Sequence, residues 1–153
     1  MFFYRIPQII KDNTEVKITA NVDEAVNFSI ESNFYNFDDD KIKVELDFNY
    51  DNETEYFSFM NFILDQNKKT ELVQFIDGIK NDMPVVFDSD SEFYSDYPHR
   101  LLAFPYKNKY RFIVIMLEDY DNSEFFTMDM LVDKQVLYAS FSGILTDIEK
   151  FNS

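Results

Sequence analysis

With 153 residues, 14 Lys and Arg against 29 Asp and Glu, and a formal net charge of −15, the chain has the size of one domain and a strongly acidic character. This charge repels nucleic acid and anionic lipid, so we expect neither direct nucleic-acid binding nor membrane attachment. The absence of Cys excludes thiol nucleophiles and Cys-ligated zinc. The two glycines, Gly78 and Gly143, both fall in predicted helices, so no glycine-rich loop remains to hold a phosphate. No apolar run approaches the ~18 residues of a membrane span, and we expect a soluble, cytoplasmic protein.

Short strands with one polar face are predicted for the first third of the chain. Residues 2–6 stop at a proline, and residues 16–20 and 26–31 alternate apolar with polar side chains. Residues 33–40 are aromatic and then acidic, and the three aspartates at their end predict a turn. The clearest alternation follows at residues 42–50, where the core-facing side chains are Ile42, Val44, Leu46, Phe48 and Tyr50.

Residues 110–118 predict the central strand, because they form the longest run of β-branched and aromatic residues without a turn former. Both faces of this strand are apolar, so both must be covered. Two stretches have helical periodicity and are the candidates for that cover. They are residues 70–80, with Thr70 as N-cap, and residues 134–151.

The remaining alternating stretches predict four more strands, at residues 56–64, 85–87, 101–106 and 124–131. The first of these forms a hairpin with residues 42–50. Pro98 precedes the third and Pro105 interrupts it, and prolines at these points indicate a sheet edge. We therefore predict a single α+β domain over residues 1–153, with a mainly antiparallel twisted sheet of about six to eight strands and two helices packed on it.

Few residues indicate catalysis. His99 is the only histidine, and neither an orienting carboxylate nor a nucleophile-elbow motif accompanies it. Asp88, Asp90 and Glu92 alternate like the start of a calcium loop, but Phe93 stands where that loop needs Gly. We expect no enzyme activity, cofactor or metal, with a small carboxylate- or metal-dependent hydrolase as an alternative. The basic cluster of Arg100, Lys107, Lys109 and Arg111 is predicted to pair with neighbouring acids.

The acids are unevenly distributed. Residues 31–55 carry nine acids and two lysines, and residues 118–133 carry six acids and no base. Such a surface attracts a basic protein and speeds its association. Solubility alone is an equally good explanation of this composition.

The last third of the chain resembles small acidic immunity proteins of bacterial toxin systems, of the WapI type. The resemblance lies in the closing helix, Leu-x-x-x-Phe-x-x-Ile-Leu-x-Asp-Ile-Glu-Lys-Phe at residues 137–151, and in the order of elements from about residue 26 onward. It implies a non-enzymatic inhibitor that neutralises a cognate toxin.

The leading hypothesis is therefore an acidic immunity protein that binds a basic toxin, plausibly a nuclease, and blocks its active site. The alternative, which also uses an acidic surface to bind a basic protein, is a phage-encoded anti-defence protein that mimics DNA. The residues predicted to contact the partner are Asp38, Asp39, Asp40, Asp47, Asp51, Glu53, Asp88, Asp90, Glu92, Tyr94, Asp119, Tyr120 and Asp121.

Overall fold

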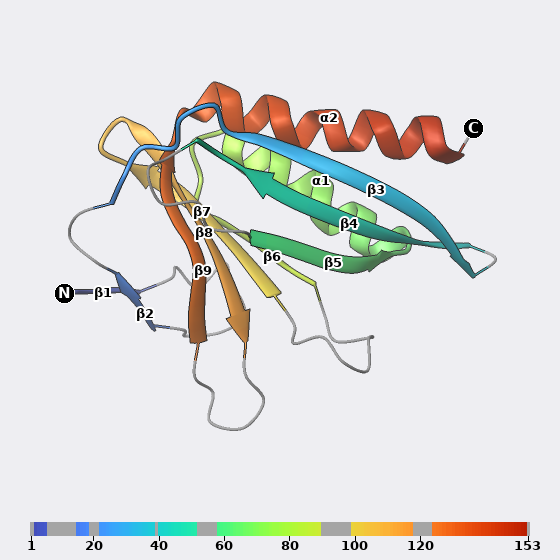
Figure 1. Cartoon of the computed structure of the whole chain (residues 1–153), viewed down its shortest axis with the longest axis horizontal. Helices are drawn as coiled ribbons and strands as arrows, with labels where there is room; N and C mark the ends of the chain where they lie inside the picture. Colours follow the sequence, from blue (N-terminus) through green and yellow to red (C-terminus); the bar gives the residue numbers. More distant parts are fainter. Residues whose placement is uncertain are drawn as a thin grey trace.

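A computed structural model describes residues 2–5, 15–18, 22–38, 40–51, 58–89, 99–117 and 124–152. Nine strands and two helices are found in these ranges (Figure 1). In chain order they are β1 (Phe2–Arg5), β2 (Glu15–Ile18), β3 (Ser29–Asp38), β4 (Lys41–Asn49), β5 (Ser58–Leu64), α1 (Gln66–Lys80), β6 (Val85–Asp88), β7 (His99–Tyr106), β8 (Lys109–Leu117), β9 (Glu124–Val132) and α2 (Lys134–Asn152).

The strands form separate antiparallel sheets. β3, β4 and β5 make a three-stranded sheet, β6 to β9 make a four-stranded sheet, and β1 and β2 make a two-stranded sheet. The α+β class and the antiparallel pairing are confirmed, but the prediction of one sheet of six to eight strands is wrong. Alternation in sequence identifies a strand and its faces, whereas the identity of its neighbour depends on contacts distant in sequence. Here α1 separates β5 from β6, and the chain starts a second sheet after the helix.

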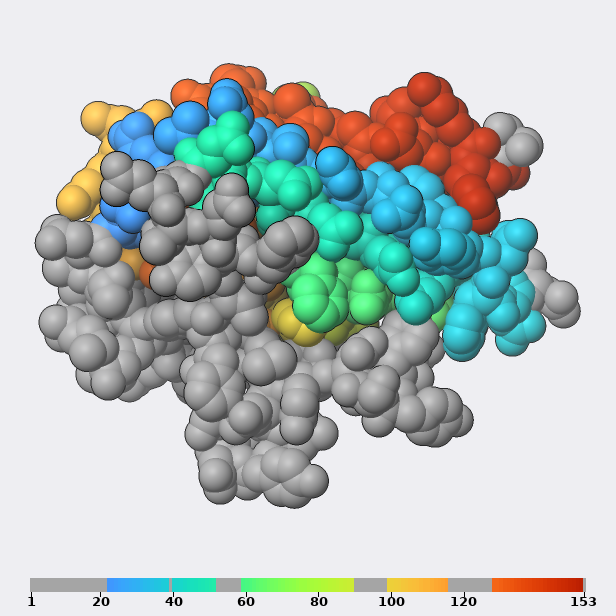
Figure 2. Space-filling model, in the orientation of Figure 1, coloured from blue at the N-terminus to red at the C-terminus, as the bar shows by residue number. Residues whose placement is uncertain are grey.

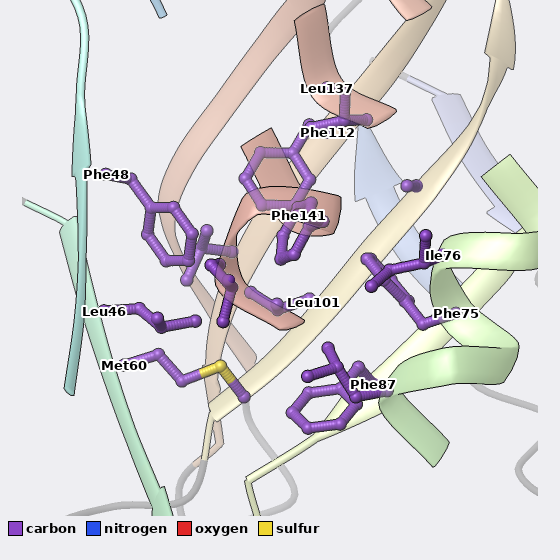
Figure 3. Close-up of a cluster of buried hydrophobic side chains, with 14 of the residues drawn as sticks. Leu46, Phe48, Met60, Phe75, Ile76, Phe87, Leu101, Phe112, Leu137 and Phe141 are labelled. Atoms are coloured by element: carbon purple, nitrogen blue, oxygen red, sulfur yellow. The ribbon is translucent and has the colours of Figure 1, made fainter. Parts of the chain in front are cut away.

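One hydrophobic core joins the two larger sheets to both helices. Figure 3 shows side chains from β4, β5, β8 and both helices pointing into it. The Phe112 ring is central, and its edge-to-face contacts reach Phe28, Phe48 and Phe141 at centroid distances of 5.4–5.7 Å. Edge-to-face stacking of this kind adds to the apolar area that the rings bury. Much of the aromatic content of the chain therefore fills the core.

The central strand, β8, is buried on both faces as predicted. Phe112 and Val114 belong to the main core, whereas Ile113 and Ile115 belong to a second buried cluster with Leu102 and Phe104. This second cluster contains no helix residue. The prediction that the two helices cover both faces is therefore wrong, because α1 and α2 pack against each other on the main core (Figure 1).

Two local predictions are also corrected. Helix α1 is capped by Asp65, whose carboxylate accepts a hydrogen bond from the Lys68 N–H at 2.8 Å, so the helix begins before the predicted cap, Thr70. Strand β7 lies between β6 and β8 and not at an edge. Pro105 is tolerated there because the first residue of β6, Val85, pairs with Ala103 and β6 does not extend to Pro105, so the missing N–H of Pro105 removes no bond to β6.

Candidate functional site

The three-stranded sheet has one face turned away from the main core, and this face is partly exposed. On β4 the even-numbered side chains from Ile42 to Phe48 are buried in the core, so the odd-numbered ones point away from it. The strand register extends this outer face across β3 and β5 in three cross-strand rows. The first row is Glu31, Asp47 and Phe59, the second is Asn33, Glu45 and Asn61, and the third is Tyr35, Lys43 and Ile63.

The outer face is acidic at its centre. Glu31 lies directly opposite Asp47, and Glu45 occupies the next row on the same side of β4. The only base in the three rows is Lys43, whose Nζ lies 3.3 Å from the Glu45 carboxylate. Like charges directly opposite each other on neighbouring strands destabilise a sheet. A cation from outside would remove this repulsion, so the face is electrostatically suited to a basic partner.

Two aromatic side chains stand at diagonal corners of this face. Tyr35, on β3, is 49% exposed and Phe59, on β5, is 47% exposed. The Phe59 ring contacts the buried His99 ring at a centroid distance of 5.6 Å. Figure 2 shows β3, β4 and β5 lying at the surface of the molecule on this side. Exposed, partly fixed aromatic rings are typical anchors of protein interfaces.

The turn end of the β3–β4 hairpin also carries exposed acidic and aromatic side chains. Asp38 pairs in register with Lys41, and Phe37 is the extra residue of a bulge between that pair and Asn36. The side chains of Phe37, Asp38 and Asp40 are all exposed. Two of the predicted contact residues, Asp38 and Asp40, therefore lie at the tip of a hairpin whose outer face also carries a third, Asp47.

The other described candidates lie elsewhere. Asp51 follows β4 at the opposite end of the sheet from the hairpin tip, and its carboxylate accepts a hydrogen bond from the Asn27 side-chain amide at 3.0 Å. Asp88 ends β6, and both of its oxygens accept hydrogen bonds from the Arg100 guanidinium, at 2.7 and 3.3 Å. The prediction that the basic cluster pairs with acids is confirmed for Arg100 and also for Arg111, which pairs with Asp129.

Eight predicted contact residues lie outside the described ranges. They are Asp39, Glu53, Asp90, Glu92, Tyr94, Asp119, Tyr120 and Asp121.

His99 has a structural environment. Its backbone N–H donates to the Ser89 hydroxyl at 2.7 Å, and the Ser89 N–H donates to the His99 carbonyl at 2.8 Å. The Ser89 hydroxyl oxygen thus accepts a hydrogen bond from the backbone N–H of His99, where β6 and β7 meet. Within the described ranges, no group of three or more His, Asp or Glu side chains is placed to hold a metal ion.

Sequence reasoning missed Glu31, Glu45 and Phe59 as members of the face. The outward direction of Glu45 was visible in the alternation of β4. The position of Glu31 opposite Asp47 depends on the register of β3, which extends through residues that the sequence predicted to approach a turn.

Comparison with protein-family models, with curated proteins and with solved structures gave no significant match. The resemblance of the closing helix to immunity proteins therefore stays a prediction. No helix in the described part of the chain is long and apolar enough to cross a membrane.

Proposed function

We propose that the chain is a non-enzymatic inhibitor that binds a basic protein through the outer face of β3, β4 and β5 and blocks that protein's active site. A bacterial toxin is the partner that the sequence favours. One observation carries the proposal, namely the carboxylates of Glu31 and Asp47 placed opposite each other between two exposed aromatic rings, Tyr35 and Phe59.

The opposed Glu31–Asp47 pair lowers the stability of the sheet, and a need for solubility alone does not explain it. Acids spread over separate positions, such as Asp77, Asp147 and Glu149 on the helices, keep a protein soluble without facing each other across two strands. An opposed like-charge pair instead lowers sheet stability by a few tenths of a kcal/mol to about 1 kcal/mol. Lys or Arg side chains of a partner convert this repulsion into attraction, and the aromatic corners add apolar contact area.

The test is an affinity capture with two charge-matched variants. One carries Glu31→Gln, Glu45→Gln and Asp47→Asn on the outer face, and the control carries Asp77→Asn, Asp147→Asn and Glu149→Gln on the helices. Both change the net charge equally. We expect the unaltered chain and the control to capture the same basic protein from native lysate, and the face variant to lose it.

The captured protein is then assayed for its own activity with and without the chain. Inhibition by the unaltered chain but not by the face variant is expected. Equal capture by the face variant and the control would refute the assignment of the face. A captured protein whose activity is unaffected would refute inhibition. A captured protein that is a DNA-binding defence protein and not a toxin would assign the DNA-mimic function in place of toxin neutralisation.

A further inference from the structure

The four strands that end the two larger sheets differ in how their outer edges are covered. β9 is joined by residues 23–25, through Ala25 N–H to Leu131 O at 2.8 Å and Leu131 N–H to Asp23 O at 3.0 Å. β6 has only four residues, and residues 62–64 of β5 are buried. β3 has ten residues, and β4 is its one strand neighbour in the part of the chain that the structure describes.

The burial pattern shows that β3 is less covered than its neighbour β4. The core-facing side chains of β4 are at most 7% exposed, whereas Ile30, Ser32 and Phe34 of β3 are only half-buried. Helix α2 runs beside β3 (Figure 1), and on the core-facing side of the strand the Phe151 ring lies 5.8 Å from that of Phe34. Within the described ranges, residues 29–36 make no backbone hydrogen bond to an element other than β4. Every second amide and carbonyl of this stretch therefore points away from β4, and none of them has a backbone partner among the residues that the structure describes.

Apart from Glu31 and a bulge at its end, this edge lacks the devices that usually protect one. Residues 32–37 read Ser-Asn-Phe-Tyr-Asn-Phe and contain no charge, no Pro and no Gly. Natural proteins block open edges with Lys, Pro, bulges or very short strands, because unpaired strands recruit other strands. The bulge at Phe37 limits the open edge to residues 29–36. These eight residues form a stretch long enough to pair with an added strand.

We propose that the partner adds an extended, basic segment as a fourth strand along residues 29–36 of β3. This inference rests on the proposed function, because it specifies how the same basic partner is held. The side chains of the added strand on the outer face lie beside Glu31, Asn33 and Tyr35, so Lys or Arg at alternate positions meets the acidic centre of the face. A second copy of the chain is disfavoured, since each copy has a net charge of −15 and acidic residues at both ends of β3, Glu31 and Asp38.

The test uses two capped octapeptides with equal charge and length, one alternating Lys and Val and one alternating Lys and Pro. The Pro peptide cannot pair as a strand. We expect the Val peptide to bind with a Kd below about 1 mM and the Pro peptide to bind at least about tenfold more weakly. At saturation, amide hydrogen exchange should slow at every second residue of 29–36 with the Val peptide only.

Protein variants provide a second readout. The backbone N–H groups of neighbouring residues in a strand point to opposite sides, here to β4 and to the outer edge. Of the two variants Ser32→Pro and Asn33→Pro, one therefore removes an N–H from the outer edge, and the other removes a hydrogen bond to β4. The variant that keeps the unaltered unfolding midpoint should lose Val-peptide binding.

Equal binding of both peptides would overturn strand addition while leaving the acidic face intact. Strand addition would also be overturned if the Val peptide did not bind at about 1 mM. It would be overturned as well if amide hydrogen exchange in residues 29–36 were already slow without peptide because the chain associates with itself. Failure of the proposed function is recognised separately, by equal capture with the face variant and its control.

Discussion

The buried Arg111–Asp129 pair allows a quantitative prediction about stability. The Arg111 side chain is 0% exposed and that of Asp129 is 14% exposed, and the two form parallel bonds of 2.8 Å from Nε and 2.7 Å from a terminal nitrogen. The guanidinium also lies over the Tyr106 ring, 5.1 Å from its centroid. Asp129→Ala removes the carboxylate but keeps the charge of Arg111 in the interior. Breaking such a pair costs about 3–5 kcal/mol.

The matched control is Asp88→Ala, which breaks the similar cross-strand pair with Arg100. Asp88 is 38% exposed and Arg100 is 7% exposed, so water reaches the site of the lost carboxylate although the guanidinium stays buried, and we expect a smaller cost of about 1–2 kcal/mol. Urea unfolding followed by far-ultraviolet circular dichroism gives both values, and a slope of about 2 kcal/mol per molar converts the Asp129→Ala cost into a midpoint shift of about 1.5–2.5 M.

A double replacement separates charge burial from packing. Arg111→Met with Asp129→Leu removes both charges and keeps apolar volume, so it should recover most of the stability lost in Asp129→Ala. Equal midpoints for Asp129→Ala and Asp88→Ala, or no recovery in the double variant, would refute the reasoning.

Three further outcomes are expected. Gly143→Ala should stabilise the protein by about 0.5–1 kcal/mol in urea unfolding, because a Cβ there meets no atom within 4 Å and α2 gains helix propensity. Gly78→Ala should destabilise it, because the new Cβ would overlap the Val85 side chain; equal effects of the two substitutions would contradict this difference. Burial, and secondarily the Asp82 charge, raises the pKa of Tyr110 to about 12 from 10.0, so folding is favoured by the neutral phenol and that contribution is lost as pH rises from 10 through 12. Tyr110→Phe should therefore lose less stability over that interval, and parallel pH profiles of the two proteins would disprove this.

The local part of the fold was predictable from the sequence because local patterns determine it. The alternation at residues 42–50 identified β4 and its buried side, and the apolar stripes located both helices. The start of α1 was missed because two residues, Asp65 and Thr70, are both chemically suited to cap a helix.

The non-local part was not predictable in the same way. The division into two sheets depends on strand pairings, and neither side of β8 identifies the elements that cover it. The candidate face was also only partly predictable, because its residues come from three strands whose pairing the sequence does not determine. Asp47 could be selected from the alternation of its own strand, whereas Glu31 becomes its neighbour only through the register of β3 with β4.

The most direct test of the central claim is the association rate of the captured basic partner, measured by stopped flow against ionic strength for the unaltered chain, the face variant and the helix control. If the outer face steers the encounter, the unaltered chain and the control show a steep fall in rate with salt, and the face variant associates more slowly with a shallower dependence. Equal rates and equal salt dependence for the face variant and the control would show that net charge alone acts, and would contradict the assignment of the face.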